Sequence, residues 1–208
     1  MIKIVSICGS PVPGSSTEIL LRRIGSTIGQ TLSSRSRHDF VRISDHDIVP
    51  CQACGEAPTP RYCFIDDAMT GIYASIEKCD CLLFGSPIYF DSVSAQAKTL
   101  IDRCNCMRPY NFDRAPSDHH FIRLLQRARP GAIVLVGGEK AWFEGARRCV
   151  AGFFKWIEIT HEACLKFYSI EDKKIGEVRE HHDILREADK IGRRLARLIE
   201  RQHGRRQP

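Results

Sequence analysis

The sequence contains no apolar run that approaches the ~20 residues of a membrane-spanning helix. It also has no signal-peptide layout, because Met1 leads directly into a short run of β-branched apolar residues. No internal repeat is visible, and residues 203–208 form the one low-complexity stretch. We therefore expect a soluble, cytoplasmic protein that has no membrane partner.

Three common nucleotide and phosphate motifs are missing as well. Gly9 and Gly14 have the spacing of the P-loop glycines, but Ser15 stands where that motif requires Lys. A phosphatase loop of the Cys-x5-Arg kind would need Arg at position 14. The dinucleotide pattern G-x-G-x-x-G fails because Pro11 follows Ser10. What remains is a hydroxyl-rich loop suited to the phosphate of a mononucleotide.

The composition is that of an ordinary globular protein, with 43% hydrophobic and 27% charged residues. Its 208 residues suffice for one sizeable core, so we expect a single domain over 1–202 and a disordered basic tail at 203–208. Residues 172–208 hold eleven Lys or Arg and seven Asp or Glu, and so carry four of the six net positive charges. A basic surface attracts anionic cofactors. No helix-turn-helix pattern is present, and we expect no nucleic-acid partner.

The N-terminal segment has the pattern of a strand, a loop and a helix start. Residues 2–7 are apolar and β-branched, and residues 8–17 are rich in Gly, Ser and Thr. Backbone N–H groups at a helix N-terminus bind anions together with such hydroxyls. Ser16 or Thr17 is expected to cap the helix. An ordinary turn is the alternative, because Gly, Pro and Ser also populate turns.

Strand and helix patterns alternate along the rest of the chain. The predicted strands are 2–7, 39–43, 81–85, 131–136 and 163–169, and the predicted helices are 19–32, 69–78, 94–104, 121–127, 142–157 and 184–198. This alternation, with central strands that are apolar throughout, predicts an α/β fold with a doubly wound parallel sheet. Such sheets bind ligands at the carboxyl ends of their strands, which here lead into the loops 8–17, 86–94 and 137–142.

A set of short segments is similar to the motifs of one known family. They are Gly9-Ser10-Pro11, Thr17-Glu18-Ile19-Leu20, Asp66-Asp67-Ala68-Met69, the run from Cys79 to Phe90, Ser92 to Ala95, Lys98, and Leu100 to Arg103. They resemble the flavodoxin-like NAD(P)H-dependent FMN reductases over residues 2–155, and most specifically in the Ser-Pro-x-Tyr segment 86–89. The resemblance implies a flavodoxin-like, doubly wound, five-stranded parallel sheet in a three-layer sandwich.

The resemblance also implies bound FMN. Its phosphate would lie at the first loop, and its isoalloxazine ring would lie along the loops that follow the third and fourth strands. The residues implied are Ser10, Pro11, Ser15, Ser16, Thr17, Pro87, Ile88, Tyr89, Phe90, Gly137 and Gly138. For Tyr89 and Phe90, core packing at a strand end is the alternative. Family members often carry a basic residue at Val12 and Asn at Gly14 and Ser16, so phosphate binding here would rest on hydroxyls and N–H groups alone.

The function that the resemblance implies is that of an FMN-dependent oxidoreductase. It would accept hydride from NAD(P)H and reduce a flavin, a quinone or another small or protein acceptor, with no side chain assigned as acid or base. A non-enzymatic FMN electron carrier is one alternative, although such carriers are usually acidic and this chain has a net charge of +6. A cysteine-based redox sensor is another.

The chain has ten cysteines, which are not expected to form disulfides in a cytoplasmic protein. Seven of them are expected to be small buried hydrophobes: Cys8, Cys79, Cys81, Cys104, Cys106, Cys149 and Cys164. Cys51, Cys54 and Cys63 instead resemble those of the family's iron–sulfur branch. Ala57 replaces the third cysteine of that branch, and a [4Fe–4S] cluster normally takes four thiolates, so we favour no intact cluster. Four alternatives remain for these cysteines. They could hold a cluster with an outside ligand, hold zinc with His46 as the fourth ligand, form a redox-active Cys51–Cys54 pair, or bind no metal.

Four aromatic residues fall in or beside loops near the expected flavin. They are Tyr110, Phe112, Trp142 and Phe143. A monomer would expose them to water, whereas a subunit interface would bury them as aromatic anchors. We therefore expect a homodimer or a homotetramer.

Overall fold

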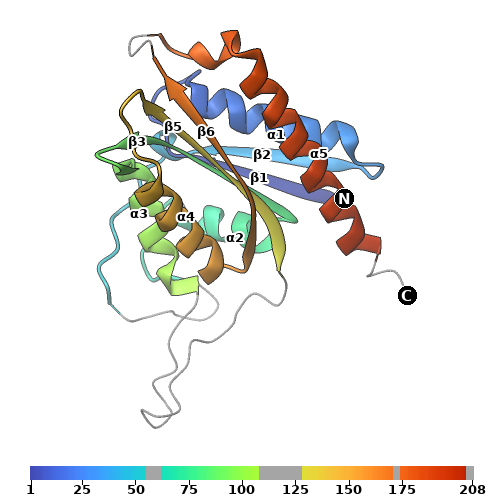
Figure 1. Cartoon of the computed structure of the whole chain (residues 1–208). Helices are drawn as coiled ribbons and strands as arrows, with labels where there is room; N and C mark the ends of the chain where they lie inside the picture. Colours follow the sequence, from blue (N-terminus) through green and yellow to red (C-terminus); the bar gives the residue numbers. More distant parts are fainter. Residues whose placement is uncertain (55–61, 108–127, 171–173, 205–208) are drawn as a thin grey trace, which may run out of the picture.

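The computed structural model describes four segments of the chain, residues 1–54, 62–107, 128–170 and 174–204 (Figure 1). Ala57, Tyr110, Phe112 and the predicted helical segment 121–127 lie outside them. Within the described segments, no helix is both long and apolar enough to cross a membrane.

Five parallel strands form the centre of the fold. They are β1 (Ile2–Cys8), β2 (Ser36–Arg42), β3 (Cys81–Tyr89), β5 (Arg129–Gly138) and β6 (Ile159–Ser169). Their order across the sheet is β2-β1-β3-β5-β6, which is the flavodoxin-like arrangement. A short strand, β4 (Ser92–Val93), pairs antiparallel with the end of β3. The predicted five-stranded parallel sheet is confirmed, and the β4 hairpin is an addition to it.

Helices cover both faces of the sheet and give the predicted three layers (Figure 1). On one face lie α1 (Ser16–Thr31) and α5 (His182–Gly204), and on the other lie α2 (Met69–Lys78), α3 (Ala95–Arg103) and α4 (Glu144–Trp156). Within the described segments, short 3-10 turns join the elements: η1 (Ile43–Asp45), η2 (Cys104–Met107) and η4 (Glu177–Glu180). The α2 helix has the predicted bounds.

The central strands are apolar throughout because alternate residues face opposite helix layers. In β3, Leu82 and Phe84 belong to the core beneath α2, α3 and α4, whereas Cys81 and Leu83 belong to the core beneath α1 and α5. All four side chains are fully buried. Because helices cover both faces of the sheet, a ligand can reach it only at an edge. The predicted loops lie at the carboxyl edge.

Three strands begin earlier than the sequence pattern predicts. β2 begins at Ser36 rather than 39, β5 at Arg129 rather than 131, and β6 at Ile159 rather than 163. The added residues lack a clear apolar pattern, but they pair with existing strands: Ser36 with Ile2, and Ile159 with Arg129. Pairing with a neighbouring strand outweighs local propensity at these positions.

The C-terminal helix α5 extends to Gly204, two residues past the boundary expected at 202. The ring of His203 lies 3.1 Å from a carboxylate oxygen of Asp80. The other oxygen of Asp80 accepts the Lys3 N–H at 2.8 Å. These contacts fasten the helix end to the sheet, so His203 and Gly204 continue the helix rather than a disordered tail.

Candidate functional site

The loop between β1 and α1 turns through Gly14, whose φ of 71° is readily adopted only by glycine. Ser15 follows and caps α1, because its Oγ accepts the Glu18 N–H at 3.3 Å. The expectation that Ser16 or Thr17 caps the helix is therefore wrong. Any of these three adjacent hydroxyl residues satisfies the sequence rule, and the Gly14 turn selects the first. The N–H groups of Ser16 and Thr17 lie in the first helical turn, where an α-helix supplies no acceptor for them.

The serine hydroxyls of this loop accept hydrogen bonds from the backbone. Ser10 Oγ accepts the Val12 N–H at 3.3 Å, and Ser16 Oγ accepts the Val178 N–H at 3.2 Å. A hydroxyl that accepts such a bond still has its own hydrogen to donate. The loop therefore gathers donors around the N-terminus of α1, which is the donor set that a phosphate requires.

Glu18 lies in the first turn of α1 and organises the loop. Its carboxylate accepts the Gly14 N–H at 2.9 Å, Nε of Arg22 at 2.7 Å and Nη2 of Arg42 at 2.5 Å. Burial alone would raise the pKa of Glu18, but these three hydrogen bonds lower it to about 2. Glu18 is therefore ionised at neutral pH, and its charge is matched by two guanidinium groups.

The second predicted loop is a tight hairpin between β3 and β4. Phe90 and Asp91 occupy its tip with φ angles of 49° and 58°, the left-handed pair that a type I′ turn requires. Pro87 is partly buried and Ile88 is buried, whereas Tyr89 is half-exposed and Phe90 is fully exposed. Core packing at the strand end thus accounts for Ile88, but it does not account for Tyr89 or Phe90.

Hydrogen bonds tie this hairpin to the loops on either side. Ser94, just after β4, donates from Oγ to the carbonyl of Gly9 at 2.7 Å, and its N–H donates to Ser86 Oγ at 2.9 Å. At the hairpin tip, Asp91 Oδ1 accepts the Trp142 N–H at 2.9 Å. The three predicted loops therefore form one connected unit at the carboxyl edge of the sheet.

The third loop follows β5. A Cβ atom at Gly137 would lie only 2.5 Å from Cβ of Ala141 and 3.2 Å from Cβ of Ile88, so the missing side chain lets the loop pack on the hairpin. Trp142 is 76% exposed. Phe143, expected to be exposed in a monomer, is instead buried with its ring 4.7 Å from that of Tyr168. The expectation for Phe143 is wrong, because α4 begins after it and turns its ring inward.

The predicted metal ligands fall within residues 46–63, which follow η1 in the sequence. Cys51 and Cys54 are exposed, Cys63 is partly buried with its sulfur 3.8 Å from Nη2 of Arg103, and His46 is exposed. Among the residues that the structure describes, no three Cys, His, Asp or Glu side chains are grouped as a metal site requires. The three predicted ligands therefore do not fit a cluster or a zinc ion in this conformation. Ala57, which stands at the third cysteine position of the iron–sulfur branch, lies outside the described residues.

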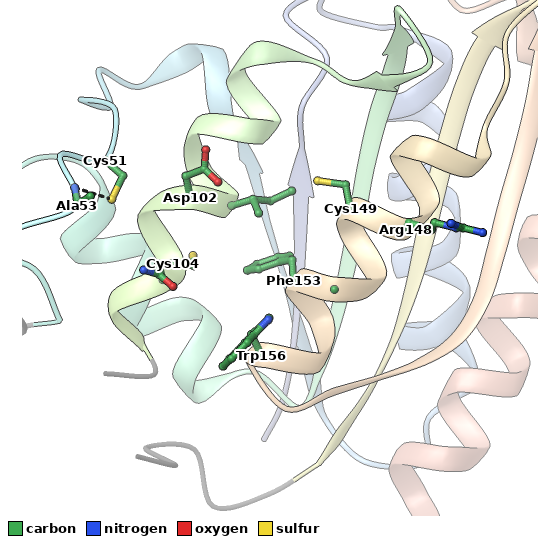
Figure 2. A pocket seen from close by; sticks show the side chains of 11 residues that line it. Cys51, Ala53, Asp102, Cys104, Arg148, Cys149, Phe153 and Trp156 are labelled. Carbon is green, nitrogen blue, oxygen red and sulfur yellow. Dashed lines mark hydrogen bonds between the residues drawn. The ribbon is translucent and has the colours of Figure 1, made fainter. Parts of the chain in front are cut away.

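Cys51 instead lines a pocket of about 540 Å³ between α3 and α4 (Figure 2). Cys104, Cys149 and Trp156 also line it, and it contains none of the residues predicted to hold FMN. Burial raises the pKa of the Cys149 thiol and raises that of Cys104 further, so neither is a reactive thiolate at neutral pH.

All ten cysteines are free. Four of the seven expected to be small buried hydrophobes are buried: Cys8, Cys79, Cys81 and Cys104. The other three are only partly buried: Cys106, Cys149 and Cys164.

The sheet order, with the connected loops at the carboxyl edge of the sheet, defines a flavodoxin-like protein. Residues 2–164 match the family model of the NADPH-dependent FMN reductases. The chain belongs to this family, and it is an oxidoreductase that uses FMN.

Two curated relatives confirm the predicted branch of the family. An iron-sulfur flavoprotein of Methanosarcina thermophila is 29% identical over 157 residues, which cover 76% of this chain and 73% of the relative. An iron-sulfur flavoprotein of Archaeoglobus fulgidus is 28% identical over 137 residues, which cover 66% of this chain and 63% of the relative. The chain thus spans somewhat less than two thirds of the second relative.

Solved structures support the same fold. A flavone reductase superimposes with a TM-score of 0.67 at 12% identity, covering 96% of this chain and 63% of that one. An FMN-dependent NADH-azoreductase from Bacillus anthracis, in complex with FMN, gives a TM-score of 0.65 at 13% identity and covers 93% of this chain and 99% of that one. At these identities the similarity shows the fold alone.

Proposed function

We propose that FMN lies across the three connected loops of the carboxyl edge. Loop residues Ser10, Pro11 and Ser15, with Ser16 and Thr17 of the first turn of α1, would hold the phosphate. The hydroxyls that keep a free hydrogen and the first-turn N–H groups support this placement. The chemistry of this donor set fits a phosphate group without a basic residue in the loop itself.

The isoalloxazine ring would lie beside the segments 87–90 and 137–138. Ile88 and Gly137 pack together there, which brings the ends of β3 and β5 to one place. The exposed ring of Tyr89 stands next to them and would contact a flat ligand. Two hydrogen bonds support the proposal most strongly, one from Ser94 to Gly9 and one from Trp142 to Asp91. Together they hold the three loops in fixed positions relative to one another.

We further propose that NAD(P)H supplies the hydride and that a flavin, a quinone or another small or protein acceptor receives the electrons. FMN, when bound, supplies the redox chemistry. The chain's own residues bind it, orient it and keep water from one side of the site. A non-enzymatic electron carrier, which would use the same FMN site, is the alternative.

Anaerobic addition of NADPH or NADH to the purified flavoprotein separates the two functions. A reductase loses its visible flavin absorption within seconds and regains it when an acceptor is added. Flavin that is reduced by dithionite but by neither nicotinamide would show that the protein is a carrier. Comparing the two nicotinamides at equal concentration also identifies the preferred donor.

We also propose that the protein is a homodimer or homotetramer that works in the cytoplasm. Trp142, Tyr89 and Phe90 form an exposed aromatic rim at the carboxyl edge, which a second copy would cover. Ten free cysteines are typical of a reducing compartment. Light scattering at micromolar concentration should give a mass above that of one chain, and a single-chain mass would contradict the assembly.

A further inference from the structure

The loop proposed to hold the phosphate has no charged side chain of its own. Residues 8–17 contain no Lys or Arg. The carboxylates of Glu18 and Asp45 are both bound by guanidinium groups: Arg42 pairs with both of them, and Arg22 pairs with Glu18. Arg22 and Arg42 are therefore both engaged by carboxylates rather than available to an incoming phosphate.

One further cation lies at the loop, and it comes from the far end of the sequence. A Cβ atom at Gly14 would lie 3.7 Å from Nη2 of Arg179, in η4. Arg179 is exposed, and its Nη1 donates a long 3.4 Å bond to the carbonyl of Gly176. Within the described residues it forms no ion pair, unlike its neighbour Lys174, which is paired with Glu180 at 2.6 Å. Arg179 is thus a cation beside this loop that forms no ion pair with the described residues.

The segment that carries Arg179 is fixed in place from two sides. Glu177 is buried, and its carboxylate accepts the Ser169 hydroxyl and the Ile170 N–H, the latter at 3.1 Å, at the end of β6. Val178 donates its N–H to Ser16 Oγ at 3.2 Å, which joins η4 to the first turn of α1. The backbone of η4 is therefore fixed beside the loop, which keeps Arg179 within reach of it.

The backbone next to η4 also approaches the loop closely. Gly176 has a φ of 73°, and a Cβ atom there would lie 2.7 Å from the carbonyl oxygen of Gly14. Any larger residue would push the two segments apart. The contact between Gly14 and Gly176 thus sets how near Arg179 comes to the N-terminus of α1.

We propose that Arg179 binds the phosphate of FMN and supplies the positive charge that the loop itself lacks. This inference rests on the proposed function, because it assumes that the phosphate lies at residues 10–17. A guanidinium group matches the phosphate oxygens in pairs of charge-assisted hydrogen bonds. Arg179 lies beyond residues 2–164, the part of the chain that matches the family model, so family membership does not assign it this role.

The test compares FMN with riboflavin, which lacks the phosphate. Arg179→Met is made together with Arg197→Met, which removes the same charge from an exposed position further along α5. Affinities of both ligands are measured on flavin-free protein by quenching of flavin fluorescence. We expect Arg179→Met to weaken FMN binding at least about tenfold and to leave riboflavin binding unchanged. Arg179→Lys should recover part of the loss, and Arg197→Met should bind FMN like the wild type.

The salt dependence gives a second readout. The FMN affinity of the wild type should fall as salt is added, and that of Arg179→Met should fall less steeply. If Arg179→Met and Arg197→Met bind FMN equally well at low salt, the proposed role of Arg179 is wrong. Unaltered circular dichroism of each variant shows that the fold is intact.

A further variant, Thr17→Val, shows whether a negative result rejects only the role of Arg179 or also the placement of the phosphate at residues 10–17. A roughly tenfold or larger loss of FMN affinity in Thr17→Val, without any effect of Arg179→Met, would reject Arg179 alone. If neither variant changes the FMN affinity, and riboflavin binds as tightly as FMN, then the phosphate does not lie at this loop and both proposals fail.

Discussion

The hydroxyl of Ser94 donates a 2.7 Å hydrogen bond to the carbonyl oxygen of Gly9, and both residues are buried. The hydroxyl oxygen of Ser94 also caps α3, because it accepts the Ala97 N–H at 3.2 Å. The contact joins the loop after β1 to the loop after β3, across 85 positions of sequence. One side chain therefore fixes the distance between the two parts of the proposed flavin site.

Replacing Ser94 with Ala should lower the free energy of unfolding by about 1–3 kcal/mol, because the Gly9 carbonyl loses its partner and α3 loses its cap. FMN affinity should fall as well. Chemical denaturation measures the first effect. Ser75→Ala is the control, since the Ser75 hydroxyl donates a solvent-exposed bond to the Gly71 carbonyl within α2, and its loss should cost about 0.5 kcal/mol or less. Equal losses in the two variants would contradict this role.

A buried ion pair between Asp67 and Arg103 holds the chain that follows η1 against α3. Nη1 of Arg103 lies 2.5 Å from Oδ2 of Asp67 and donates to the Val49 carbonyl at 2.7 Å. Asp67→Asn should lower the free energy of unfolding by about 3–5 kcal/mol, because a buried guanidinium is left unpaired. Asp102→Asn, in the exposed pair with Lys98, should cost about 1 kcal/mol or less. Comparable losses would show that the Asp67 pair is not buried in solution.

Acid should destabilise the protein partly through Glu18. Its pKa in the folded protein is about 2, against an ordinary value of 4.5, so its stabilising contribution is present above about pH 5 and is lost as the pH falls toward 2. Glu18→Gln should be less stable at pH 7 and should lose less stability on acidification. Thermal unfolding of the wild type and of Glu18→Gln, from about pH 7 toward pH 2, measures how steeply the stability of each protein falls with pH. Glu187→Gln, which removes a charge from an exposed pair, is the control, and parallel wild-type and Glu18→Gln curves would contradict the prediction.

Much of the fold was predictable because burial determines it. The runs 81–85 and 131–136 are apolar throughout, which only a sheet covered on both faces requires, and they proved to be the cores of β3 and β5. The loops at the carboxyl edge follow from that topology. Local pattern alone could not supply the start of β2, which is set by pairing with β1.

Contacts at the candidate site between segments far apart in the sequence were not predictable. Arg179 lies far from Gly14 in sequence, and no periodic pattern indicates that η4 packs on the first loop. The Ser94 to Gly9 bond is equally non-local. The burial of Phe143 depends on where α4 begins, and the sequence pattern does not fix that residue. Such contacts depend on how elements pack rather than on what each segment prefers.

Aerobically purified protein should be yellow from flavin and contain little iron. Cys51, Cys54 and Cys63 are not gathered in the described structure, and Ala57 removes one of the four thiolates that a cluster normally takes. Ala57→Cys should increase the iron content if the segment can still close around a cluster. Ala57→Ser is the control. Anaerobically prepared wild-type protein with the iron content of an intact cluster would contradict this interpretation.

Hydrogen–deuterium exchange of the flavin-free protein, with and without added FMN, tests the central claim most directly, because it locates the ligand without any substitution. We predict that FMN slows exchange in residues 9–17, 87–91 and 137–142, where the three connected loops lie, and that riboflavin protects the last two segments but not the first. Slower exchange confined to residues 101–105 and 148–156, which line the pocket beside Cys51, would place the flavin elsewhere and contradict the account.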